Sequence, residues 1–252
     1  MNFEILTLFP EIVEPFFKNS IMAKSVESQK VSYSLINFRD YATDVHKSVD
    51  DSPYGGGAGM VIKPQPLGAA LDAIDAKNKR VIYPTPSGKP FNQQYAYELA
   101  KEENLVIICG RYEGIDQRII DLYVDDEICI GDYVISSGEI ASLVIVDAVY
   151  RLLEGVITSE SLLEESFSNN LLEYPQYTRG ETYCGISVPD VLLSGHHANI
   201  EKWRHKKRLE KTFLNREELL DYSLLSEDDK KFIEKLKRKL RRGYKDGFNE
   251  SN

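Results

Sequence analysis

Short apolar runs rich in β-branched residues alternate with longer amphipathic stretches over the first 158 residues. The short runs predict strands, the longer stretches predict helices, and their alternation is typical of an α/β fold with a parallel sheet covered by helices. The predicted strands are Phe3–Phe9, Val31–Phe38, Arg80–Tyr83, Leu105–Cys109, Ile128–Ile130 and Val134–Ile135. The predicted helices are Pro10–Ser25, Pro66–Ala76, Gln93–Glu102 and Ile140–Leu153.

The pattern changes after Gly155. Thr158–Asn170 is rich in Ser, Glu and Asn and has little periodicity, which indicates a linker or mobile loop. Beyond it, Ile200–Leu214 and Asp228–Arg242 have helical apolar spacing. The residues expected on the inner faces of these helices are Leu209, Phe213, Phe232, Leu236 and Leu240. We therefore predict a first domain over 1–158, a flexible linker over 159–174 and a small helical domain over 175–252.

Length and composition limit the class of protein. A chain of 252 residues with 42% hydrophobic and 28% charged residues can bury one large core plus a smaller helical domain. It has no apolar run near the roughly 18 residues that span a bilayer and no leader-like segment, so we expect a cytoplasmic protein without a membrane partner. Cys109, Cys129 and Cys184 lack CxxC spacing, which argues against a zinc site and a disulfide framework.

Charge is unevenly distributed along the chain. The net charge is −9, yet residues 201–245 hold 16 of the 31 Lys and Arg against 9 of the 40 Asp and Glu, a local charge of +7. An acidic body with a basic C-terminal segment is what a local polyanion-binding surface looks like, although a solvated helix face has the same pattern.

Glycine-containing loops follow three of the predicted strands. These loops are Tyr83–Gly88, Cys109–Asp116 and Ile130–Glu139. Ligands bind beyond the carboxyl ends of parallel strands, so the three loops together predict one pocket built largely from backbone amides. Neither the P-loop pattern nor GxGxxG between a strand and a helix occurs, and HExxH and GxSxG are absent as well.

A separate glycine run, Gly55–Gly59, interrupted by Ala58, lies between the acidic pair Asp50–Asp51 and apolar Val61–Ile62. Glycine adds nothing to a core and loses the most backbone entropy on ordering. Such a run indicates either a flexible surface loop or a backbone that approaches a ligand closely.

Several segments together resemble the bacterial tRNA (guanine-N1) methyltransferases, the TrmD family, from the first strand to about Asn215. The segments that carry the resemblance are Leu8–Pro10, Asp50–Met60, Cys109–Asp116, Ile130–Tyr133, Leu171–Arg179, Leu193–His197 and Trp203–Arg204. The resemblance implies a SPOUT-type parallel sheet with a deep trefoil knot and an obligate homodimer. It also implies S-adenosylmethionine as methyl donor, N1 of the guanosine 3′ of the anticodon (tRNA position 37) as acceptor, and a divalent ion, Mg²⁺, for which the sequence shows no ligand set.

The resemblance assigns roles to residues of this chain. Arg151 matches the catalytic arginine, and Glu113 matches the residue that recognises the target base. The matches for donor binding are Tyr83, Pro84, Thr85, Pro86, Ser87, Gly88, Gly110, Tyr112, Gly114, Ile130, Gly131, Asp132, Tyr133, Val134, Ile135, Ser137 and Gly138. The further matches for tRNA binding are Asp50, Tyr54, Gly55, Gly56 and Gly57.

The chain departs from the family pattern at the general base. The family has an aspartate immediately before Ser-Phe, whereas this chain has Glu165 before Ser166-Phe167, with Glu164 beside it. The carboxylate is kept and one methylene is added. Further departures are Gly180 after Arg179, and Ser137 and Ala141 in the donor loop. Two other readings therefore stay open: a SPOUT methyltransferase acting on another RNA base, and a non-catalytic RNA-binding knot protein; a Rossmann dehydrogenase is the most distant alternative.

Overall fold

The computed structural model describes residues 1–158 and 165–249. The chain divides into two compact units, Met1–Thr158 and Ser159–Asn252. Glu164 and the other residues of 159–164, part of the predicted linker, lie outside the described residues.

The first unit is an α/β fold around a five-stranded sheet, with strand order β2-β1-β6-β5-β7. Every pairing in this sheet is parallel. The strands are β1 Asn2–Thr7, β2 Ser32–Asn37, β5 Arg80–Pro90, β6 Asn104–Ile108 and β7 Asp126–Cys129. A separate antiparallel pair is formed by β3 Asp50–Asp51 and β4 Val61–Ile62. The predicted class of the fold and the predicted parallel sheet are confirmed.

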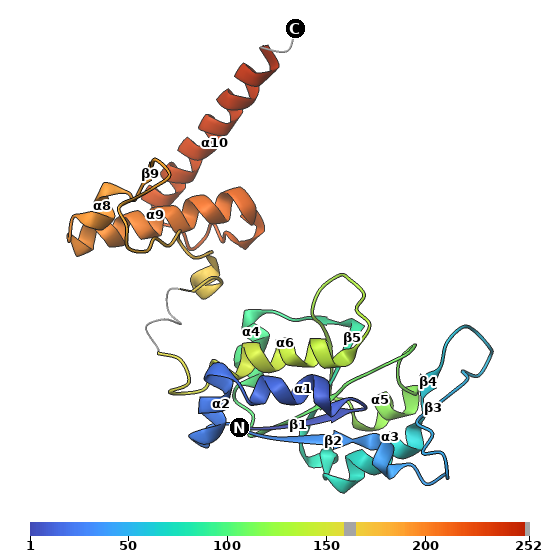
Figure 1. Ribbon diagram of the computed structural model, residues 1–252. Coiled ribbons are helices and arrows are strands. Elements are labelled where there is room, and N and C mark those ends of the chain that lie inside the picture. The colour runs from blue at the N-terminus through green and yellow to red at the C-terminus, as the bar shows by residue number, and fades with distance from the viewer. Residues whose placement is uncertain (159–164, 250–252) are drawn as a thin grey trace. The chain divides into compact units, whose positions relative to one another are not determined.

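Helices cover both faces of the sheet (Figure 1). They are α1 Pro10–Phe17, α2 Ser20–Glu27, α3 Pro64–Ala73, α4 Gln93–Leu99, α5 Gln117–Tyr123 and α6 Gly138–Tyr150, with short 3-10 helices η1 Phe38–Tyr41 and η2 Ala76–Asn78. Side chains alternate between two cores: Phe3 and Ile5 of β1 pack with α1, α4 and α6, whereas Leu6 packs with α3 and α5. Strands buried on both faces explain why the sequence shows continuous apolar runs.

Three sequence predictions need correction. The predicted helix Pro10–Ser25 is two helices, because Ser20 adopts a left-handed conformation with φ +58°. Val134–Ile135 is not a strand, and both side chains are exposed in a loop. Helix α5 has no counterpart among the predicted helices; it begins where the Asp116 carboxylate accepts a hydrogen bond from the Arg118 amide at 3.0 Å.

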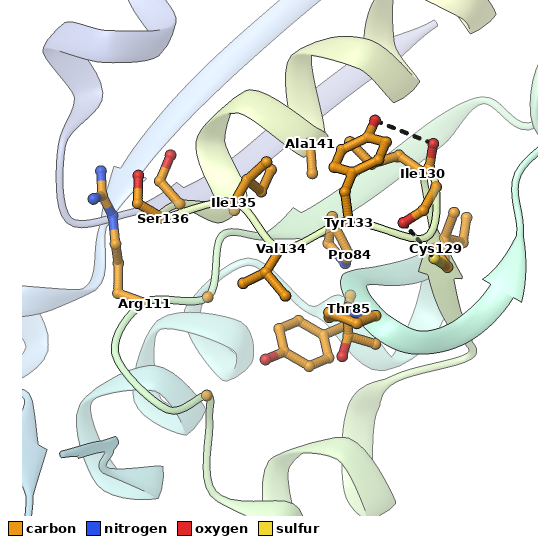
Figure 2. Close-up of a pocket in the computed structure, with 18 of the residues that line it drawn as sticks. Pro84, Thr85, Arg111, Cys129, Ile130, Tyr133, Val134, Ile135, Ser136 and Ala141 are labelled. Atoms are coloured by element: carbon orange, nitrogen blue, oxygen red, sulfur yellow. Dashed lines mark hydrogen bonds between the residues drawn. The ribbon is translucent and has the colours of Figure 1, made fainter. Parts of the chain in front are cut away.

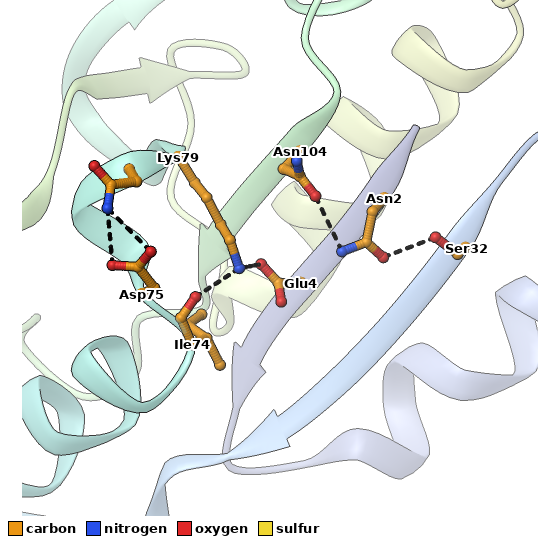
Figure 3. A network of polar contacts seen from close by, with 8 residues as sticks. Asn2, Glu4, Ser32, Ile74, Asp75, Lys79 and Asn104 are labelled. Carbon is orange, nitrogen blue, oxygen red and sulfur yellow. Dashed lines mark hydrogen bonds and ion pairs between the residues drawn. The ribbon is translucent and has the colours of Figure 1, made fainter.

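The amino-terminal edge of the sheet is held by polar side chains (Figure 3). Asn2 joins three strands, since its side chain accepts from the Ser32 hydroxyl at 2.9 Å and donates to Asn104 at 3.4 Å. The Lys79 ammonium contacts the Glu4 carboxylate at 2.6 Å and donates to the Ile74 carbonyl at 2.5 Å. These contacts fix the strand ends opposite the glycine loops.

The second unit is mainly helical. Its elements are η3 Ser168–Asn170, β8 Thr182–Tyr183, β9 Ile186–Ser187, α8 Asp190–Leu193, α9 His197–Asn215, η4 Glu217–Leu219 and α10 Glu227–Asn249. The buried core consists of Leu171, Leu209, Phe213, Leu220 and Ile233, with Phe232 and Leu236 packed against it.

Two predictions for this unit differ from the structure. Leu240 is 51% exposed, because it lies one turn along α10 beyond Leu236, past the residues that pack in the core. Leu171, which falls in the predicted linker, is buried in this core, and Leu172 donates its amide to Thr212 Oγ1 of α9 at 2.8 Å. This end of the expected linker is therefore packed as part of the second unit.

Candidate functional site

The three glycine-containing loops enclose one cavity in the first unit. It has a volume of about 290 Å³ and lies at the carboxyl ends of β5, β6 and β7 (Figure 2). This volume is near the lower end of the roughly 300–1,000 Å³ typical of small-molecule sites. The lining residues are Tyr83, Pro84, Thr85, Pro86, Gly110, Arg111, Tyr112, Glu113, Gly114, Ile128, Cys129, Ile130, Gly131, Tyr133, Val134, Ile135, Ser136, Ser137, Gly138 and Ala141.

Most residues expected to bind the methyl donor lie on this cavity. The exceptions are Ser87, Gly88 and Asp132. Gly88 instead serves the pairing of two strands, because a Cβ atom there would clash with the backbone of Glu127 and Ile128, and glycine lets β5 approach β7. Pro84 and Lys89 both pair with Ile128, and the residues between them bulge out of the strand as a loop.

Other glycines let the cavity loops touch one another. A Cβ atom on Gly110 would lie 2.9 Å from the Tyr83 ring, and one on Gly138 would lie 2.5 Å from the Gly110 nitrogen. The Gly138 amide donates to the Gly110 carbonyl at 2.9 Å. The wall between these loops is therefore backbone, so a ligand in the cavity would meet peptide groups and small side chains there.

Arg111 is a site residue that sequence reasoning missed. Its Nε lies 2.9 Å from Oε2 of Glu139, which is fully buried in the first turn of α6. The other carboxylate oxygen accepts from the Thr7 hydroxyl at 2.7 Å, and the Arg111 guanidinium lies 4.4 Å from the Phe9 ring centroid. The signal in the sequence is a glutamate in the first turn of a mostly apolar helix.

Two titratable side chains at or behind the cavity wall stay neutral. Burial raises the pKa of the Tyr83 phenol, and burial followed by the nearby Glu139 charge raises the pKa of the Cys109 thiol. Cys109 Sγ also lies 3.1 Å from the Ser142 hydroxyl. A protonated thiol is a poor nucleophile, so the site does not support covalent catalysis by this cysteine.

Glu113 and Tyr112 lie at the open side of the cavity. Both side chains are exposed, and Tyr112 has a φ of +58°. The adjacent β3–β4 hairpin carries Asp50, which is half-buried, and Tyr54, which is fully exposed. Neither of these two residues nor Gly55, Gly56 or Gly57 lines the cavity.

The two expected catalytic residues belong to different units. Arg151 follows the last residue of α6 in the first unit, and Glu165 lies in the second unit. Arg151 does not line the cavity. Burial raises the pKa of Asp147, one turn before Arg151, and the arginine charge opposes this shift.

The described part of the chain shows neither a cluster of metal ligands nor a membrane-spanning helix. Over residues 1–158 and 165–249 no group of three or more His, Cys, Asp or Glu side chains is placed to hold a metal ion. In the same described residues, no helix has both the length and the apolar character to cross a bilayer.

Comparison with known proteins gives the family. The chain matches the family model described as "tRNA (Guanine-1)-methyltransferase TrmD" over residues 1–222. A protein of Treponema denticola named tRNA (guanine-N(1)-)-methyltransferase is 66% identical over 221 residues, covering 88% of this chain and 91% of its own. A protein of the same name from Borrelia turicatae is 56% identical over the full length of both chains. Another, from Treponema pallidum, is 60% identical over 87% of this chain and 88% of its own. The chain belongs to the TrmD family of tRNA (guanine-1)-methyltransferases.

Proposed function

We propose that this protein transfers a methyl group from S-adenosylmethionine to N1 of the guanosine that follows the anticodon, tRNA position 37. One observation carries the proposal: in a TrmD-family chain, the three loops matched to donor binding surround a single cavity. Since tRNA is a cytoplasmic substrate, the reaction takes place in the cytoplasm.

The cavity loops would hold the donor through backbone groups. Gly110, Gly131 and Gly138 place no side chain between the cavity and the backbone of their loops, and Ile130 and Ile135 supply apolar surface. Bound S-adenosylmethionine supplies an electrophilic methyl group on its sulfonium. The protein therefore has to orient the acceptor and remove its proton. Orientation alone lowers the activation free energy by several kcal/mol.

Glu113 recognises the acceptor base in this proposal. Guanine presents two adjacent donors, N1–H and the N2 amino group; because the N1 proton has to leave to the general base, the Glu113 carboxylate accepts from the N2 amino group. The Glu113 side chain lines the open side of the cavity, where a base can enter. Tyr112 beside it offers an aromatic face for stacking.

Glu165 and Arg151 act on the proton and the developing charge. Transfer of the N1 proton to the Glu165 carboxylate makes N1 nucleophilic and moves negative charge onto O6. A placed general base contributes about 10²–10⁴-fold in rate. The Arg151 guanidinium would stabilise the charge on O6.

A homodimer completes the site in this proposal. The resemblance places residues from two subunits at each site, and Arg151, which lies in the same unit as the cavity, does not line it. Ile140 and Val144, four residues apart on α6, are both exposed, as is Ile12 on α1. An exposed apolar stripe of this kind suits a second copy of the chain. Light scattering at micromolar concentration that shows a fully active monomer would contradict the dimer.

The finer architecture is part of the same proposal. A deep trefoil knot in the first unit would involve the loop Ile130–Gly138, whose end lies against Gly110. The part of the predicted linker before Leu171 would connect the first domain to a basic tRNA-binding domain, which includes Leu171 and Leu172 as well as the predicted residues 175–252. Magnesium is implied only by the resemblance, and the described residues offer no group to hold it, so no step is assigned to it.

A methyl-transfer assay on tRNA transcripts tests the proposal. Purified full-length protein should methylate a transcript with guanosine after the anticodon and leave the adenosine variant unmodified. Donor binding without transfer to any transcript would support a non-catalytic RNA-binding protein. Methylation at another base would support a different RNA methyltransferase.

A further inference from the structure

The glycine-rich hairpin between β3 and β4 has two parts with different surroundings. A Cβ atom added to Gly55 or Gly56 would meet nothing within 4 Å. A Cβ atom added to Gly59 would lie 2.5 Å from Oε1 of Glu113, 2.6 Å from its Cγ and 2.9 Å from its Cδ. The tip of the hairpin is therefore open, whereas Gly59 is in direct contact with the Glu113 side chain.

Backbone hydrogen bonds hold Gly59 in this position. The Glu113 amide donates to the Met60 carbonyl at 3.0 Å, and the Ile62 amide donates to the Gly114 carbonyl at 3.0 Å. The Asp116 amide donates to the Ile62 carbonyl at 3.1 Å. Ile62 is fully buried and packs in the same core as Ile115. The end of the hairpin and the cavity loop thus form one rigid unit, because hydrogen bonds join them at three successive points.

The Glu113 carboxylate depends on this contact for its position. The side chain is exposed, and its carboxylate has no hydrogen bond or ion pair to any residue that the structure describes. A Cβ atom at position 59 would meet the flexible end of a side chain and not backbone. We therefore expect a larger residue at 59 to move the carboxylate aside while the fold is kept.

We propose that Gly59 positions the Glu113 carboxylate and thereby determines selectivity for guanosine. The inference rests on the proposed function, in which this carboxylate accepts from the 2-amino group of guanine. Inosine keeps N1–H and lacks the 2-amino group, so it reports on this hydrogen bond. A displaced carboxylate loses the hydrogen bond and with it the preference for guanosine over inosine.

The test compares Gly59→Ala with Gly185→Ala. Both glycines have a left-handed backbone, with φ of +82° and +79°, so the two variants carry similar strain, and only the first adds a contact. The measurement is kcat/KM on transcripts with guanosine or inosine at the target position. The guanosine-to-inosine ratio should fall about tenfold in Gly59→Ala, as expected for loss of one well-placed base contact, and stay unchanged in Gly185→Ala.

A second pair of variants tests the route through Glu113. In a Glu113→Ala background, Gly59→Ala should leave the ratio unaltered, because the group it displaces is gone. Gly59→Asn carries the same Cβ atom and tolerates positive φ better than alanine, so it replaces Gly59→Ala if that variant is unstable. An unchanged ratio in Gly59→Ala and Gly59→Asn when Glu113 is present would overturn the inference. An equal change with and without Glu113 would overturn it as well.

The proposed function fails separately, when the wild-type protein does not methylate guanosine transcripts. In that case a crystal structure of Gly59→Ala still tests the positioning. A Glu113 carboxylate displaced from its wild-type position supports it, and an unmoved carboxylate refutes it.

Discussion

Arg111 Nε lies 2.9 Å from Glu139 Oε2, and the glutamate side chain is completely buried. The pair joins the loop after β6 to the first turn of α6, and the Thr7 hydroxyl at the end of β1 completes the cluster. Three separate segments of the chain thus meet at one carboxylate beside the cavity. A buried charge is tolerated only when it is paired, so the arrangement of these three segments beside the cavity depends on the Glu139 carboxylate.

Glu139→Gln should therefore destabilise the protein strongly. The substitution keeps the shape of the side chain but leaves the Arg111 cation without its counter-charge, which costs about 3–5 kcal/mol for a buried pair. Equilibrium unfolding in urea measures the change. Glu14→Gln is the matched control, since Glu14 pairs with Lys18 at 2.7 Å on an exposed helix face. That variant should lose less than about 1 kcal/mol, and similar losses in both would show that burial of the pair does not matter.

Asp126 should make stability depend on pH in the acid range. Burial raises its pKa, but hydrogen bonds from Arg80 at 2.6 Å and Tyr95 at 2.5 Å outweigh burial and hold the pKa below its usual value. Because the folded-state pKa is lowered, the stabilisation is present above the unfolded pKa of about 3.9 and is lost as pH falls through the folded pKa. The difference in unfolding free energy between the wild type and Asp126→Asn should narrow as pH falls from about 5 to about 3. A constant difference would show that the carboxylate charge contributes nothing.

The basic face of α9 should contribute electrostatically to tRNA binding. Lys206 is exposed, and Lys207 pairs with Glu210 at 2.6 Å. Arg208 is a poorer test residue, because it donates to the Leu172 carbonyl and so supports the second unit itself. The double variant Lys206→Gln/Lys207→Gln should weaken tRNA binding and reduce the slope of log affinity against log salt by up to about 2, since each phosphate contact contributes roughly 0.9. An unchanged slope would mean that these charges are only solvated.

The position of the cavity could be predicted from the sequence because it follows from the order of the strands. Parallel strands bring their carboxyl ends to one edge, so the loops Tyr83–Gly88, Cys109–Asp116 and Ile130–Glu139 had to be neighbours. A short β-branched run also led to a wrong prediction. Val134–Ile135 was expected to be a strand, but both residues lie in a loop that lines the cavity.

Contacts between distant segments could not be predicted in this way. The Arg111–Glu139 pair joins a loop to a helix start, and the Gly59–Glu113 contact depends on how a hairpin packs. Neither leaves a periodic trace in the sequence. At Leu240 the predicted helix is present but the predicted burial is wrong. The side chain is exposed because α10 continues past the small core of the second unit.

Glu165 is the sharpest test of the mechanism. If its carboxylate accepts the N1 proton, Glu165→Ala should lower the single-turnover rate by about 10²-fold or more and leave donor binding nearly unchanged. Glu165→Asp should keep substantial activity, because the family resemblance places the shorter acid at this position. Rapid-quench kinetics with excess enzyme and a donor-binding titration separate the two effects.

Glu164→Ala is the control, because it removes the neighbouring carboxylate. It tests whether the family's general base corresponds to Glu165 and not to the residue before it. Successive side chains point in different directions in helices and in strands alike, so this variant should keep most of its rate. An inactive Glu164→Ala with an active Glu165→Ala would shift the general base by one residue. Near-normal rates in both variants would place the base elsewhere, and the proton of N1 would then have to leave through a group outside this segment.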